Sequence, residues 1–181
     1  MAKKRRPVLV TPALLRWTSN VGCYSTRRIF QYPEDTVFEA YKVSRSDGRS
    51  PNHPEARPIL ICKRGAELVV EDANTQASQD CGRGVNVATF DWCYRSYCTY
   101  LNYCTYLRSV GKRKYKCWLV RFTGKDIAAI PNLNEGKFRL FRGYVVRRVK
   151  LDKYEKETNQ CGSTNTNKRT TATKRATRRS R

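Results

Sequence analysis

The sequence has little of what enzymes and membrane proteins depend on. It contains one histidine and one methionine, and its 15 acidic residues face 37 lysines and arginines. Charges interrupt every apolar run well before the roughly 18 residues that a membrane-spanning helix needs. His53 lies in the proline-rich stretch "SPNHPEARP", which offers no rigid support for a general base, and no nucleophile, base and electrophile can be grouped. We therefore expect no enzymatic activity.

A secretory signal is also missing, because the basic start is followed only by the short apolar stretch "PVLVTPALL" without a small-residue cleavage site. The eight cysteines are then expected to stay reduced. Four of them form a candidate zinc set, but none makes the close C-x2-C pair that lets two thiolates chelate one ion. The alternative is that they are small buried apolar residues and that the protein has no cofactor. The candidate zinc ligands are Cys93, Cys98, Cys104 and Cys117.

The net charge of +22 is unevenly distributed along the chain. Residues 1–33 hold seven bases and no acid, and residues 34–91 are slightly acidic, with ten acids and seven bases. Residues 92–157 hold sixteen bases and five acids, and the tail from 158 adds seven bases. A positive field of this size attracts polyanions, so nucleic acid is the first candidate partner and an anionic membrane surface the second.

Both ends carry basic clusters that resemble nuclear import signals. "MAKKRRPVLV" has the form of a single-cluster signal, and "KRTTATKRATRRSR" that of a spaced signal or a histone-like tail. These clusters predict a nuclear import receptor as a partner. A mitochondrial presequence is the rival interpretation of residues 1–33, although Pro7 and Pro12 would break its amphipathic helix. The import candidates are Lys3, Lys4, Arg5, Arg6, Lys174, Arg175, Arg178 and Arg179.

Three parts are expected along the chain: a basic arm over 1–33, one folded domain over 34–157 and a disordered basic tail over 158–181. Residues 44–58, rich in Ser, Pro, Asp and Gly, should form a flexible loop inside the domain. The predicted fold is α+β, with a small antiparallel sheet packed on a Tyr- and Cys-rich helix near 91–109. Its strands are expected near 36–43, 59–62, 66–70, 115–122 and 137–151. Gly143 would mark a bulge or bend in the last of them.

The repeated pentad in "YCTYLNYCTYL" (97–107) permits a helix or a strand. Tyr, Thr and Cys favour a strand, but Cys93, Tyr97, Tyr100, Cys104 and Leu107 recur at the spacing of one helical face, which favours a helix. Thr89 or Asp91 could cap its start. On this helix, Tyr97 and Tyr100 would face the core, while Tyr103 and Tyr106 would be free to contact a ligand.

The basic residues between 108 and 150 are the main functional signal. Thirteen bases and two acids lie there, so most of the positive charge has no acidic partner nearby in the sequence. If the strands near 115–122 and 137–151 are neighbours in one sheet, their outward positions form a positive surface edged by tyrosines. The predicted nucleic-acid-binding residues are Arg108, Lys112, Arg113, Lys114, Lys116, Arg121, Arg139, Arg142, Arg147, Arg148, Lys150, Tyr103, Tyr106, Tyr115 and Tyr144.

In overall composition the chain is similar to small basic structural or regulatory proteins of eukaryotic viruses, and to ribosomal proteins with charged extensions. We predict a nuclear-directed, viral RNA- or DNA-binding protein that packages or regulates nucleic acid without a base-reading motif. The alternatives are a matrix- or capsid-like protein that self-associates and bridges a nucleocapsid and an anionic membrane, and a ribosomal protein.

Overall fold

The computed structural model describes residues 6–18, 26–51, 57–80, 82–95, 115–132 and 136–150. The chain divides into two compact units, residues 1–149 and residues 150–181. Of the second unit only Lys150 is described, so the fold below is that of the first. The predicted tail over 158–181 lies outside the described residues.

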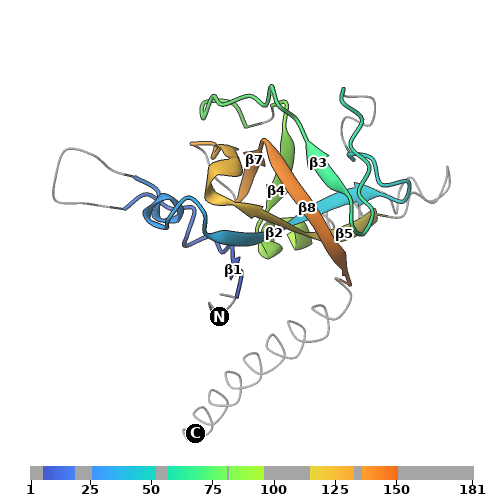
Figure 1. Ribbon diagram of the computed structural model, residues 1–181, viewed down its shortest axis with the longest axis horizontal. Coiled ribbons are helices and arrows are strands. Elements are labelled where there is room, and N and C mark those ends of the chain that lie inside the picture. The colour runs from blue at the N-terminus through green and yellow to red at the C-terminus, as the bar shows by residue number, and fades with distance from the viewer. Residues whose placement is uncertain are drawn as a thin grey trace, which may run out of the picture. The chain divides into compact units, whose positions relative to one another are not determined.

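The described residues form one strongly curved sheet (Figure 1). Its strands follow the order β3–β8–β5–β2–β4–β7–β6, and β1 lies beside β2. The β1–β2 pair is parallel and the other pairs are antiparallel. The elements are β1 (Val8–Leu9), 3-10 helix η1 (Arg28–Gln31), β2 (Val37–Arg45), β3 (Glu67–Val69), β4 (Val85–Ala88), β5 (Tyr115–Thr123), 3-10 helix η2 (Gly124–Asp126), β6 (Ile127–Ala129), β7 (Lys137–Leu140) and β8 (Arg142–Val149).

The α+β expectation holds only in its coarse form, because the described α-helix is short. It begins after Thr89 and is described through residue 95; the rest of the predicted helix, 96–109, lies outside the described residues. Thr89 caps it: the Trp92 N–H donates to the Thr89 hydroxyl at 3.4 Å and the Cys93 N–H to the Thr89 carbonyl at 3.1 Å. The Phe90 ring meets the Tyr41 ring of β2 edge-on, with centroids 5.1 Å apart, so this turn packs on β2.

The sheet is folded over on itself at Phe141. This residue alone separates β7 from β8, yet β4, β2 and β5 lie between those two strands in the sheet order. The sheet must therefore curl until its two halves meet at Phe141. The Phe141 N–H donates to the Asp126 carbonyl at 2.8 Å, and the Val70 N–H donates to the Phe141 carbonyl at 2.8 Å. These bonds anchor the bend on both sides.

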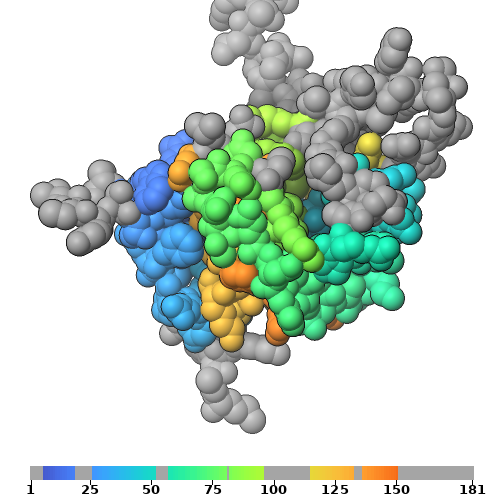
Figure 2. Space-filling model, turned by 90° about the horizontal axis from the view of Figure 1, so that it is seen from above, coloured from blue at the N-terminus to red at the C-terminus, as the bar shows by residue number. Residues whose placement is uncertain are grey.

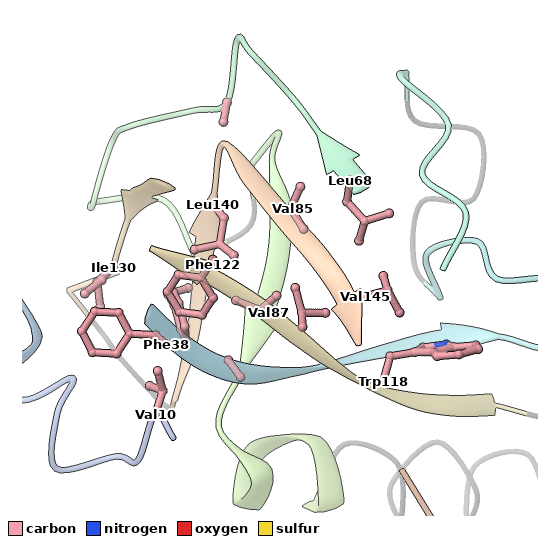
Figure 3. Close-up of a cluster of buried hydrophobic side chains, with 14 of the residues drawn as sticks. Val10, Phe38, Leu68, Val85, Val87, Trp118, Phe122, Ile130, Leu140 and Val145 are labelled. Atoms are coloured by element: carbon pink, nitrogen blue, oxygen red, sulfur yellow. The ribbon is translucent and has the colours of Figure 1, made fainter. Parts of the chain in front are cut away.

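The inner face of the curl holds the hydrophobic core (Figure 3). Phe122 stacks against Phe38 at 5.8 Å between centroids and meets Phe138 at 5.6 Å. Val120 and Val145, directly opposite each other on β5 and β8, are both fully buried. Burial of each such side chain stabilises the fold by about 1.5–3 kcal/mol, so these strands are held chiefly by their inner faces.

Two expected strands differ from the structure. Residues 59–62 form no strand, although Cys62 is buried and its N–H donates to the Gly48 carbonyl at 2.9 Å. Residues 137–151 form two strands, β7 and β8, because the chain bends at Phe141. Gly143 marks neither a bend nor a bulge: a Cβ there would lie 2.7 Å from a Val120 methyl, so glycine allows β8 to approach β5 closely. The bulge falls beyond Val145.

The predicted arm over 1–33 is not separate from the fold where it is described. Val10, Leu15 and Ile29 lie in the core, and β1 pairs with β2. The buried Arg27 guanidinium donates to the carbonyls of Leu15, Ile130 and Pro131 and stacks 4.5 Å from the Trp17 ring. Residue 33 is therefore no boundary of the compact unit. The short apolar stretch "PVLVTPALL" supplies core residues.

Arg139 corrects the prediction that it lies on the basic surface. It is 0% exposed, and its guanidinium donates to the carbonyls of Asn74 (3.0 Å), Gln79 (2.6 Å) and Gln76. These carbonyls belong to the β3–β4 connection, which lies against the β7–β8 bend in Figure 2 (green against orange). A buried guanidinium needs such partners, because an unpaired buried charge is strongly unfavourable. Arg139 therefore holds the loop to the sheet.

We predict that Arg139→Met lowers the free energy of unfolding by about 2–4 kcal/mol, because it removes the three charge-assisted bonds that hold the β3–β4 connection to β7. Urea denaturation measures the change. Arg83→Met is the matched control, since Arg83 forms an exposed pair with Asp72 at 2.9 Å, and it should cost less than about 1 kcal/mol. Equal losses in the two variants would contradict this role of Arg139.

Candidate nucleic-acid interface

The two basic strands are neighbours, as the sequence-based interpretation required. β5 and β8 pair antiparallel, with Arg121 opposite Tyr144 and Leu119 opposite Arg147. Directly opposed residues of an antiparallel pair lie on the same face of the sheet. Because Val120 and Val145 occupy the inner face, Arg121 and Tyr144 lie on the outer face.

A bulge determines which β8 bases join them. Between the pairs Val120–Val145 and Leu119–Arg147, β8 advances by two residues while β5 advances by one, so Val146 is the extra residue. Without this bulge, Arg147 would lie on the face opposite to that of Tyr144. With it, Arg142, Tyr144 and Arg147 all lie on the outer face, and all three are exposed.

A turn that the sequence analysis did not assign to the site adds two more bases. The Ala66 N–H donates to the Lys63 carbonyl at 3.0 Å, and Gly65 has φ +80°, a combination that a type II turn requires of its third residue. The Gly65 N–H then donates to the Val145 carbonyl at 2.9 Å, and the Val145 N–H to the Ala66 carbonyl at 2.8 Å. The exposed Lys63 and Arg64 are thereby fixed beside β8.

We call this set of residues the Tyr144 surface. It consists of Lys63, Arg64, Arg121, Arg142, Tyr144 and Arg147. The "KRG" sequence predicted a turn, but its position depends on the pairing of β3 with β8, which brings together segments about 75 residues apart in the chain. Local sequence patterns carry no information on that pairing.

Two acids partly neutralise the Tyr144 surface. Arg121 donates from Nε (3.1 Å) and Nη2 (2.7 Å) to one Glu39 carboxylate oxygen, Oε1, and Arg142 lies 3.5 Å from Glu67. Within the described part of the chain, Lys63, Arg64 and Arg147 form no ion pair. These three bases are thus the ones free to neutralise an added anion, while Arg121 and Arg142 are oriented by their carboxylates.

Other predicted binding residues lie elsewhere. Arg148 is exposed but opposes Trp118, and therefore faces away from Tyr144. Lys116, on the same side as Trp118, donates to the Ser46 carbonyl at 2.6 Å. Tyr115 is half-buried at the start of β5, and Lys150 is exposed after β8. The remaining predicted residues lie outside the described part: Arg108, Lys112, Arg113, Lys114, Tyr103 and Tyr106.

The proposed zinc ligands are only partly described. Cys93 and Cys117 come together beneath the first helical turn and are 0% and 2% exposed, while Cys98 and Cys104 lie outside the described residues. Among the described residues no three His, Cys, Asp or Glu side chains are grouped to hold a metal. Nor does the described chain contain a helix long and apolar enough to cross a membrane.

The Cys117 thiol lies close enough to shift the ionisation of Cys93. A hydrogen bond between the Cys93 and Cys117 side chains, together with burial, raises the pKa of Cys93 well above its ordinary value of 9.0. Protonated thiols pack as small apolar groups. In the described structure this pair therefore joins the helix to β5 by packing rather than by thiolate chemistry.

The comparisons with known proteins add nothing to the geometry of the site. No family model, curated protein or solved structure matches the chain.

We predict that stability decreases above the ordinary thiol pKa. Between about pH 8 and pH 10 the unfolded chain ionises Cys93 more readily than the folded chain does, so the free energy of unfolding decreases as the pH rises. Cys93→Ala should show a correspondingly smaller decrease over the same interval. Urea denaturation in reducing buffer at both pH values measures this, and the contribution of Cys62 is common to both proteins. Equal decreases would exclude the buried, protonated thiol.

Proposed function

We propose that this chain is a non-enzymatic, nuclear-directed nucleic-acid-binding protein that packages or regulates RNA or DNA. The observation that carries the proposal is the Tyr144 surface, where five bases and two acids gather around an exposed aromatic ring. Lys63, Arg64 and Arg147 supply charge that no described acid balances. Phosphates are the natural partners of such a surface, because neutralising them releases condensed counterions.

The basic residues of the Tyr144 surface would position the nucleic acid. Two hydrogen bonds to Glu39 give the Arg121 guanidinium a defined orientation on the outer face, and Arg142 forms a looser, exposed ion pair with Glu67. The bases before residue 6 and after residue 150 would add sequence-independent attraction to phosphate. No base-reading motif is present in the sequence, so weak sequence preference is part of the proposal.

The compositional similarity to basic viral proteins supports a viral origin. A matrix- or capsid-like protein that contacts an anionic bilayer is the competing proposal. Vesicles with and without anionic lipid, sedimented with the protein after nuclease treatment, distinguish the two. Co-sedimentation that depends on anionic lipid and survives the nuclease would favour the competitor.

We predict that Arg64→Ala combined with Arg147→Ala reduces the slope of log affinity against log salt by about 1.8 on duplex DNA, because each lost phosphate contact lowers it by about 0.9. Fluorescence anisotropy over a series of salt concentrations measures the slope. The matched control is Arg28→Ala with Arg83→Ala, which removes the same charge from η1 and the β3–β4 connection. An equal decrease of the slope in both double variants would show that only the net charge of the protein determines binding. A flat slope in the unaltered protein would contradict the proposal.

We predict that replacing Lys3, Lys4, Arg5 and Arg6 with alanine lowers the nuclear-to-cytoplasmic ratio of a fluorescent fusion too large to diffuse through nuclear pores. Replacing Lys174, Arg175, Arg178 and Arg179 as well should abolish accumulation. The ratio is measured by microscopy in transfected cells, with the Arg28→Ala and Arg83→Ala double variant as control. Full nuclear accumulation without either cluster would show that they are not import signals.

A further inference from the structure

The most exposed part of the Tyr144 surface is the tyrosine ring itself. Tyr144 is 48% exposed, although it lies within a strand that has a hydrogen-bonded partner on each side. Leu119, the apolar side chain beside Arg121 on the outer face of β5, is buried, and so is Cys117 further along the strand. The ring is therefore an apolar surface that the described fold leaves uncovered.

Gly65 explains in part why the ring remains open. Tyr144 extends toward the Lys63–Ala66 turn, and its hydroxyl lies 3.7 Å from the position that a Cβ on Gly65 would take. Among the described residues, the chain neighbours Arg64 and Ala66 aside, no other atom lies within 4 Å of that Cβ position. Because Gly65 has no side chain, it leaves the ring uncovered on this side. The positive φ of Gly65 also disfavours any larger residue there.

Bases flank the open ring on several sides. Arg142 and Arg147 lie before and after it on β8, Arg121 is directly opposite on β5, and Arg64 is in the adjoining turn. Glu67, opposite Tyr144 on β3, forms an ion pair with Arg142. The negative charges of an anionic ligand can thus bind the Lys and Arg side chains on either side while a flat group of the ligand lies on the ring. A polynucleotide with unpaired nucleotide bases has both features, whereas in a duplex the faces of the nucleotide bases are already stacked on each other.

We propose that Tyr144 is a stacking platform for an unpaired nucleotide base, which makes the Tyr144 surface a single-strand site. The inference rests on the proposed function and adds the class of nucleic acid. The Lys and Arg side chains hold the phosphates on both sides of the stacked nucleotide, and the tyrosine ring binds the nucleotide base without reading its edge. Any of the four nucleotide bases can stack on the ring, so little sequence preference is required.

The test compares Tyr144→Ala with Tyr144→Phe on a single-stranded oligonucleotide and on a duplex of the same sequence. Tyr144→Ala should weaken single-strand binding by about 5- to 150-fold and change duplex binding by less than about twofold. Tyr144→Phe keeps the ring and should bind like the unaltered protein. Phe30→Ala removes a ring of similar exposure, 50%, from η1 and should change neither affinity. Thermal melting confirms that each variant is folded.

A second measurement identifies the contact directly. An oligonucleotide carrying 5-iodouridine at each position in turn, irradiated in complex with the unaltered protein, should crosslink to Tyr144, as mapped by mass spectrometry. RNA and DNA versions of the probe show which sugar is preferred. Salt-dependent binding that Tyr144→Ala leaves unchanged on single strands, without a Tyr144 crosslink, would overturn the platform and leave the proposed function standing. Absence of polynucleotide binding at every salt concentration would remove both.

Discussion

The antiparallel pairing of β5 with β8 is the constraint on which the rest of the structure depends. Its inner face places Val120 against Val145 in the core, and its outer face places Arg121 against Tyr144. One ladder thus both stabilises the curled sheet and builds the candidate site. The bulge at Val146 allows both, because it returns Arg147 to the outer face without moving the buried valine. In a ladder without this bulge, Arg147 and Arg148 would exchange faces.

Part of the large positive charge belongs to the fold rather than to a ligand. Arg27 and Arg139 are buried, and their guanidinium groups donate to backbone carbonyls of irregular segments, such as those of Leu15 and Gln79. Lys42, also buried, donates to the Asn86 carbonyl at 3.0 Å on β4, where the β2–β4 ladder is a single residue pair long. Carbonyls serve here as partners because they need donors themselves once they are buried. Net charge therefore overstates the charge available to a polyanion.

Local sequence predicted three strands closely. β2, β3 and β5 lie within two residues of their predicted bounds, because runs of strand-prone residues bounded by turn residues mark strands even where, as at residues 117–120, both faces are buried. It did not predict the bend at Phe141, which depends on contacts with Asp126 and Val70, or the place of residues 6–18 in the core. For the site, local sequence indicated Tyr144 and Arg147. It could not separate the buried Arg139 from them, or add Lys63 and Arg64, because those positions follow from pairings distant in sequence.

The balance of charge on the Tyr144 surface favours a site that positions a nucleic acid more than it supplies affinity. Two of its five bases already hold carboxylates, and exposed charges act over only about 8 Å at physiological ionic strength. Three unpaired bases make a modest electrostatic site, so an added stacking contact would be a large share of its binding free energy. The basic sequences before residue 6 and after residue 150 can add attraction but no register, since they repeat Lys and Arg without a base-reading motif. In the proposed function, the folded surface selects the form of nucleic acid and the flanking Lys and Arg residues add affinity.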